Sequence, residues 1–194
     1  MYKKSRELEQ GNNKPYIIPE GGSNSHGAWG YISCFQEICY QVEKQSLPIE
    51  LVVVATGSGG THAGLLLGKL LTGSSIEVAS INVTADASYF KNRIYDILAD
   101  FSNHHQITNT FQPEHIVVYD GFVGQGYGKI SNAEIDIIKI FAKCEGILLD
   151  PVYTAKAMIG LETLITSKQI ESKNILFIHT GGIFGLFPHA KHLL

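Results

Sequence analysis

The sequence predicts an α/β fold with a doubly wound, mostly parallel sheet, arranged as three layers with helices on both faces of the sheet. Apolar, β-branched runs alternate with helical patterns about six times along the chain, and such alternation is typical of parallel sheets. Doubly wound sheets bind their ligands beyond the carboxyl ends of the strands. Glycine- and hydroxyl-rich segments follow the predicted strands at 21–25, 56–61, 120–129, 150–154 and 180–182. We therefore expect a ligand site at that edge.

The composition indicates a soluble domain without a nucleic-acid partner. A length of 194 residues suits one domain. The 15 Lys and Arg residues are scattered and nearly balanced by 18 Asp and Glu residues, unlike the basic stripe of a nucleic-acid-binding protein. No apolar run approaches membrane length, and the first 14 residues lack the hydrophobic core of a signal peptide. Three cysteines without a C-x-x-C pair favour a reducing compartment, so we expect a cytoplasmic protein without a membrane partner.

The first half of the chain supplies the predicted central strand. Residues 1–14 are polar and charged, and we expect a solvated helix end and a linker there, with the domain proper spanning 15–194. A short strand bounded by prolines is predicted at 15–19, and an amphipathic helix at 28–45, where apolar residues recur at three- and four-residue spacing. The patterns that follow predict strands at 51–54 and 76–83, with helices from residue 61 and over 87–103.

In the second half, a strand is predicted at 115–119. Segment 120–129 contains four glycines in ten residues, which predicts an ordered loop or a mobile lid. Ser131 and Glu134 have the spacing of a capping box, and Gly146 is placed to end the helix that the box begins. The remaining patterns predict a short strand at 147–149, a helix at 153–165 and a last core strand at 174–179.

The segment from Glu50 to Lys69 is the one around which this chain is organised. Its β-branched strand runs into a turn at 56–61 that contains three glycines in four residues, and a helix follows. Glycines let the backbone approach a ligand closely. Free N–H groups and the positive end of the helix dipole then point at one place, which predicts an anion site.

Three common kinds of glycine loop fit this segment poorly. The dinucleotide fingerprint needs a glycine where His62 stands, and the spacing over 64–70 does not match the Walker A loop. A nucleophile elbow needs a glycine two residues before Ser58, and threonine stands there. Two interpretations remain, a phosphate cradle of another type and a tight turn that binds nothing.

Four motifs together resemble one family of pyridoxal-phosphate enzymes, the D-cysteine desulfhydrases and 1-aminocyclopropane-1-carboxylate deaminases. The motifs are GGSN at 21–24, GSGGTHAG at 57–64, GYG at 126–128 with EGILLDPVYTAKA at 145–157, and FIHTGG at 177–182. The resemblance extends from about residue 14 to residue 187. It implies the tryptophan-synthase-β-like fold, so that this chain would be the large pyridoxal-phosphate domain of a fold-type II enzyme, incomplete at its N-terminus.

The resemblance also implies a cofactor, pyridoxal 5′-phosphate, and the residues that hold it. In this fold the ring nitrogen usually meets a neutral hydroxyl, and Thr180 matches that position. The dianionic phosphate would lie at the glycine-rich turn. That turn consists of Gly57, Ser58, Gly59, Gly60 and Thr61.

Three further residues are the expected catalytic or substrate-binding ones, for a small amino-acid substrate. Tyr127 and Tyr153 match tyrosines that the family places beside the substrate, although a half-buried tyrosine is more often structural. Thr154 stands where the deaminases typically have glutamate and a desulfhydrase has threonine. The resemblance thus favours D-cysteine desulfhydrase activity, with the deaminase activity as the alternative.

This sequence departs from the pattern of the family at its N-terminus. Relatives of this type begin with a further segment that contains a smaller domain and the lysine of the Schiff base, and Lys156 is not at that position. We therefore expect a truncated chain of an enzyme that is a homodimer when intact. Two alternatives are a non-catalytic remnant that only binds a phosphate-bearing ligand and a nucleotide-binding α/β domain.

The histidines offer weaker candidate sites. His62 could act as a base toward Ser58, but no aspartate is placed to orient it. His189 and His192 have helical spacing near the C-terminus, and two histidines without further ligands are a weak signal. No metal site is predicted.

Overall fold

The computed structural model describes residues 1–108 and 110–193. Four parallel strands form one sheet in the order β3-β2-β1-β4. The pairing aligns Leu51 of the central strand with Glu77 on one side and Ile175 on the other. The strands are β1 (Leu51–Thr56), β2 (Glu77–Asn82), β3 (Val117–Tyr119) and β4 (Ile175–Ile178).

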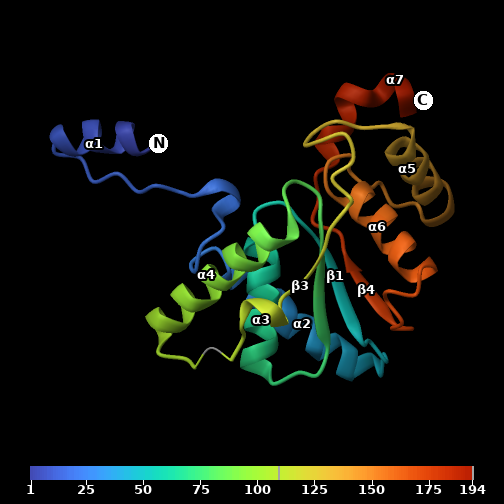
Figure 1. Cartoon of the computed structure of the whole chain (residues 1–194), viewed down its shortest axis with the longest axis horizontal. Helices are drawn as coiled ribbons and strands as arrows, with labels where there is room; N and C mark the ends of the chain where they lie inside the picture. Colours follow the sequence, from blue (N-terminus) through green and yellow to red (C-terminus); the bar gives the residue numbers. More distant parts are fainter. Residues whose placement is uncertain (109, 194) are drawn as a thin grey trace.

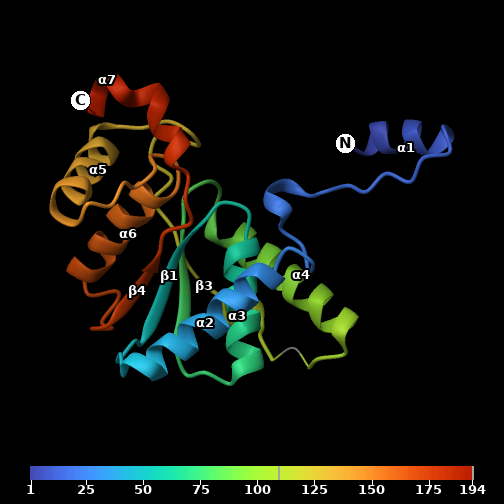
Figure 2. The same cartoon turned by 180° about the vertical axis from the view of Figure 1, so that it is seen from behind.

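Helices cover both faces of the sheet, which confirms the predicted three-layer α/β architecture (Figures 1 and 2). Helices α2 (Trp29–Gln45), α3 (Gly60–Thr72) and α4 (Ala87–His105) lie on one face, and α6 (Thr154–Thr166) lies on the other with α5 (Asn132–Glu145) beside it. The remaining helices are α1 (Tyr2–Gln10), α7 (Ala190–Leu193) and the 3-10 helices η1 (Glu20–Gly22), η2 (Pro113–His115) and η3 (Ile183–His189).

The central strand β1 is buried along its whole length because both of its faces pack against helices. Val52 and Val54 belong to the core under α2, α3 and α4, whereas Leu51, Val53 and Ala55 belong to the core under α6. This alternation is what a strand with side chains on both faces requires. It explains why the sequence at β1 is a continuous apolar run.

Helix α3 packs unusually close to α2 because glycines line the contact. A Cβ atom at Gly64 would lie 2.6 Å from the Cβ atom of Tyr31, and one at Gly68 would lie 2.5 Å from the Cβ atom of Phe35. Side chains at these positions would therefore push the two helices apart. The contact fixes the direction in which α3 leaves β1.

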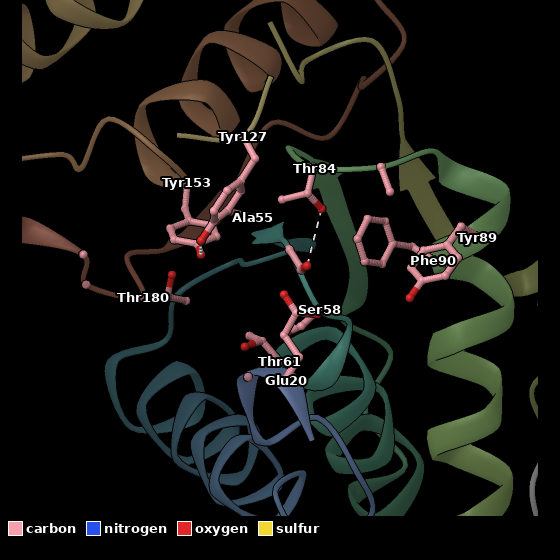
Figure 3. Close-up of a pocket in the computed structure, with 15 residues that line it drawn as sticks. Glu20, Ala55, Ser58, Thr61, Thr84, Tyr89, Phe90, Tyr127, Tyr153 and Thr180 are labelled. Atoms are coloured by element: carbon pink, nitrogen blue, oxygen red, sulfur yellow. Dashed lines mark hydrogen bonds between the residues drawn. The ribbon is translucent and has the colours of Figure 1, made fainter. Parts of the chain in front are cut away.

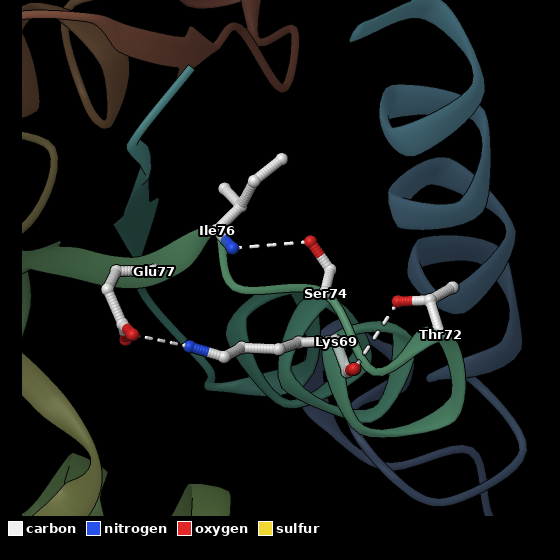
Figure 4. Close-up of polar contacts among 5 residues, drawn as sticks. All are labelled: Lys69, Thr72, Ser74, Ile76 and Glu77. Carbon is white, nitrogen blue, oxygen red and sulfur yellow. Dashed lines mark hydrogen bonds and ion pairs between the residues drawn. The ribbon is translucent and has the colours of Figure 1, made fainter. Parts of the chain in front are cut away.

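A polar turn joins α3 to β2 at the amino ends of the strands (Figure 4). Lys69 Nζ and Glu77 Oε1 form an ion pair at 2.7 Å, and the Ile76 N–H donates to Ser74 Oγ at 3.2 Å. Thr72 Oγ1 donates to the carbonyls of Gly68 and Lys69. Gly73 ends α3 with φ of 66°, and its N–H donates to the Lys69 carbonyl.

Two predicted strands are wrong. Segment 15–19 is irregular and leads into η1, because prolines at both ends lack N–H groups for a ladder. Segment 147–149 is also irregular, since the left-handed turn at Gly146 and the cap at Asp150 leave only three residues between two helices. The capping box at Ser131 and Glu134 is confirmed.

Helix α1 lies apart from the rest of the molecule, at the end of an extended segment (Figures 1 and 2). None of its residues is buried. The segment predicted to hold a helix end contains a helix of 9 residues, and residues 11–28 lead from it to α2. No helix in the described part of the chain is long and apolar enough to cross a membrane.

Candidate cofactor and substrate site

A pocket of about 590 Å³ lies at the carboxyl ends of the strands (Figure 3). It lies beyond the end of β1, which pairs with β2 on one side and with β4 on the other. This is the switch point at which doubly wound sheets bind ligands. The wall contains residues of β1, α3 and α4, together with residues of the segments that follow β1, β2 and β4 or precede α2, α5 and α6. The wall consists of Glu20, Gly21, Ala55, Gly57, Ser58, Thr61, Thr84, Ala85, Tyr89, Phe90, Tyr127, Tyr153 and residues 180–182.

The glycine-rich turn forms one end of this pocket. Helix α3 begins at Gly60, and its N-cap residue Gly59 has φ of 88°, a conformation that favours glycine. The side chains of Ser58 and Thr61 line the pocket. Two hydroxyl groups therefore lie at the positive end of the α3 dipole.

Ser23 connects this turn to the loop that precedes α2. Its buried Oγ donates to Ser58 Oγ at 2.8 Å and accepts from the Gly60 N–H at 3.2 Å. Arg93 of α4 donates from Nη2 to the Ser23 carbonyl at 2.7 Å. The cradle is thus held from the loop before α2 and from α4 as well as from β1. Sequence reasoning singled out neither the role of Ser23 nor Arg93, although the GGSN motif was a signal for the former.

Tyr127 and Tyr153 meet in the pocket wall, where the Tyr153 ring lies beside Gly57 of the turn. Their hydroxyl oxygens lie 2.5 Å apart, so one phenol donates to the other. Burial, followed by this hydrogen bond and the nearby Tyr127, raises the pKa of Tyr153 above its ordinary value. The raised pKa keeps the Tyr153 hydroxyl protonated at neutral pH, and the pair can present a proton to a ligand.

The structure does not bring Thr154 to the pocket. This side chain is fully buried, and its hydroxyl donates to Asp150 Oδ1 at 2.7 Å. The Asp150 carboxylate also accepts the backbone N–H groups of Val152, Tyr153 and Thr154 at 2.7 to 2.9 Å. Thr154 therefore belongs to the cap that begins α6 and holds the turn that carries Tyr153.

Thr180 does line the pocket, directly after β4. The segment that carries it passes close to the α6 cap, because a Cβ atom at Gly182 would lie 2.7 Å from Asp150 Cγ. Of the predicted cofactor residues, Gly59 and Gly60 do not line the pocket. The others face the pocket together.

His62 does not pair with Ser58. Its Nδ1 lies 2.8 Å from Ser80 Oγ on β2, and the ring is fully buried between α3 and the sheet. Burial lowers the pKa of His62 to about 3, so the ring is neutral at physiological pH. The described residues also contain no group of three or more His, Cys, Asp or Glu side chains that could hold a metal ion.

The parallel sheet, the hydroxyl-lined helix start and the pocket at the switch point are the features of an α/β domain with a potential anion site at the carboxyl edge of its sheet. The family model of pyridoxal-phosphate dependent enzymes matches residues 1–181. This chain belongs to that family.

The most informative relatives carry both activities that the motifs suggest. The chain is 40% identical to the mitochondrial bifunctional D-cysteine desulfhydrase/1-aminocyclopropane-1-carboxylate deaminase of Arabidopsis thaliana, covering 96% of this chain and 46% of the relative. It is 37% identical to the D-cysteine desulfhydrase of Klebsiella pneumoniae, covering 96% of this chain and 56% of the relative. The chain thus spans about half the length of the curated relatives it matches.

A solved structure supports the fold assignment. The crystal structure of a 1-aminocyclopropane-1-carboxylate deaminase homologue superposes with a TM-score of 0.87 at 34% sequence identity, covering 99% of this chain and 57% of the other. The predicted fold, that of the large domain of fold-type II pyridoxal-phosphate enzymes, is confirmed by this match.

Proposed function

We propose that this chain forms the cofactor-binding part of a pyridoxal-phosphate lyase of the D-cysteine desulfhydrase type, which converts D-cysteine to pyruvate, sulfide and ammonia. The observation that carries the proposal is one cavity lined by the helix-start hydroxyls, by Thr180 and by the Tyr127–Tyr153 pair. The helix-start hydroxyls would bind a phosphate, Thr180 would meet a pyridine nitrogen, and the tyrosine pair would contact an amino-acid substrate.

The cradle at α3 fits a phosphate. Ser58 and Thr61 offer hydroxyl donors beside the first N–H groups of the helix. Gly57 lets the Tyr153 ring pack directly against the turn, because a Cβ atom there would lie 2.8 Å from Tyr153 Cε1. No Lys or Arg side chain lines the pocket in the described part of the chain, so hydroxyl and backbone dipoles would neutralise the anion.

When bound, pyridoxal phosphate withdraws electrons from the carbon next to the substrate's amino group. The residues of this chain would orient the reactants and hold protons. The neutral hydroxyl of Thr180 would meet the ring nitrogen without adding charge. The protonated Tyr153 would donate to a substrate carboxylate or a departing group, with Tyr127 as its hydrogen-bond partner.

Two other functions remain candidates on specific observations. The names of the relatives favour 1-aminocyclopropane-1-carboxylate deaminase activity as the alternative. Thr154, which distinguishes the two activities by resemblance, bonds to Asp150, so its influence on the substrate would act through the turn that carries Tyr153. The absence of lysine from the described lining favours a chain that binds a phosphate-bearing ligand without turnover.

The first test compares pyridoxal phosphate with pyridoxal, which lacks the phosphate. Wild-type chain should bind the phosphorylated form at least roughly tenfold more tightly, because hydrogen bonds to a charged group stabilise by about 1.5–3 kcal/mol. Ser58→Ala and Thr61→Ala should each reduce the ratio of the two affinities. Thr163→Ala, which removes an exposed hydroxyl from α6, should leave this ratio unchanged. Equal affinities for both compounds would contradict the proposed cradle.

The second test asks for chemistry. Chain mixed with pyridoxal phosphate is reduced with borohydride, and labelled lysines are mapped by mass spectrometry, while pyruvate release from D-cysteine is followed in parallel. Turnover above that of free cofactor supports the lyase, and ammonia release from 1-aminocyclopropane-1-carboxylate would favour the deaminase. Phosphate-selective binding without labelling or turnover would leave only the binding function for this chain.

A further inference from the structure

The loop that carries Tyr127 is rich in glycine, and the tyrosine side chain is largely exposed. Segment 120–130 is glycine-rich, and Gly124 and Gly126 adopt φ values of 64° and 122°. Tyr127 itself is 62% exposed. A loop of this composition samples many conformations unless another element fixes it.

Lys156 of α6 supplies such an anchor. The residue is 1% exposed, and its Nζ atom donates to the carbonyl oxygens of Val123 and Gly126 at 2.7 Å each. The same two carbonyls accept the N–H groups of Gly126 and Lys129, at 3.3 and 3.2 Å. One ammonium therefore lies at the acceptor ends of two consecutive turns, and Tyr127 lies in the second of them.

Helix α6 holds both members of the tyrosine pair. Tyr153 is its N-cap residue, and Lys156 lies three positions further on. Later along the same helix, a Cβ atom at Gly160 would lie 2.9 Å from Phe122 Cγ, so the start of the loop also rests on α6. A buried ammonium is costly unless polar groups surround it, and here the two carbonyls and the nearby Glu134 fill that role.

We infer that Lys156 is a positioning residue, whose ammonium fixes the turns over 123–129 so that the Tyr127 hydroxyl meets that of Tyr153 at the pocket. The inference deepens the proposed function, since a fixed tyrosine pair matters for catalysis only if the pocket takes a substrate. Lys156 itself does not line the pocket and acts through the loop.

Amide hydrogen exchange on the full chain tests the inference without requiring activity. Peptides that cover 121–130 should exchange at least roughly tenfold faster in Lys156→Met than in wild type, because two charge-assisted hydrogen bonds are lost. Peptides from β1 and β2 should not change. Lys139→Met, which removes an exposed lysine from α5, should leave the whole pattern as in wild type. Unchanged exchange over 121–130 in a folded Lys156→Met chain overturns the inference.

Chemical rescue separates the ammonium from simple packing. Lys156→Ala leaves space for the missing part of the side chain, so propylammonium should restore slow exchange over 121–130. Tetramethylammonium, which has no N–H donor, should not restore it at the same ionic strength. Equal rescue by both cations, or by neither in a folded variant, contradicts the proposed role.

Wild-type chain provides a measurement that does not depend on how the variants fold. With 15N-labelled lysine, one ammonium group should show protons that exchange with water at least roughly tenfold more slowly than the others, as expected for a buried hydrogen-bonded group. Absence of such a signal overturns the inference. Failure to bind pyridoxal phosphate would overturn the proposed function alone and would leave these exchange results unaffected.

Discussion

Acidification should destabilise this fold through His62. The ring is fully buried, and its pKa is about 3 in the folded chain against 6.5 for an ordinary histidine. Between these values the unfolded chain binds a proton that the folded chain excludes. Stability therefore rises with pH across this window and is lost as the pH falls below 6.5.

The size of the effect follows from the shift. Each pH unit below the unfolded pKa costs about 1.36 kcal/mol. At pH 5, which lies 1.5 units below 6.5, His62 should lower the free energy of unfolding by about 2 kcal/mol. A loss of this size is a large fraction of the stability of a typical domain.

Urea unfolding of the chain at pH 7 and pH 5 measures this contribution. His62→Gln cannot take up the proton, so its loss of stability between the two pH values should be about 2 kcal/mol smaller than that of wild type. His115→Gln, which removes an exposed histidine, should show the wild-type loss. Equal losses of unfolding free energy in His62→Gln and wild type over this range would refute the proposed contribution of His62.

Three further effects on stability can be measured by the same method. Gly64→Ala should destabilise the fold by about 1–3 kcal/mol, because the new methyl group would meet α2; Gly30→Ala, which meets nothing within 4 Å, should be neutral or stabilising. Asp150→Ala should lower the free energy of unfolding by roughly 2–4 kcal/mol, since it leaves N–H groups at the start of α6 without their acceptor. A decrease of less than about 1 kcal/mol would contradict a stabilising role for this cap. Lys69→Met should change stability by less than about 1 kcal/mol, because Glu77 is 69% exposed; a loss above 2 kcal/mol would contradict this.

Elements with a strong local pattern could be predicted from the sequence. The apolar run at β1 is buried on both faces, and the glycine-rich turn after it begins a helix. The capping box at Ser131 and the terminating Gly146 also appear as predicted. In each case the residues that define the element lie within a few positions of one another.

Features that depend on distant segments could not be predicted in this way. Ser23 and Arg93 are 70 residues apart, and only the folded chain shows that they brace the turn at α3. The short apolar segment at 147–149 has the pattern of a strand. It lies between the end of α5 at Gly146 and the cap at Asp150, and it pairs with none of the four strands of the described sheet. Thr154 follows a tyrosine that faces the pocket, yet the start of α6 turns its side chain toward Asp150.

The glycine contact between α2 and α3 has a consequence for how a ligand would be received. Gly64 and Gly68 let the helices touch, and a Cβ atom at Gly60 would lie 2.6 Å from Ser23 Oγ, so α3 is packed against its neighbours from its first residue onward before any anion arrives. Association then loses little conformational entropy in ordering the protein, and more of the interaction energy is expressed as affinity. An incoming phosphate would meet donors already in position, so binding would proceed by docking into a formed site without rearrangement of the helix.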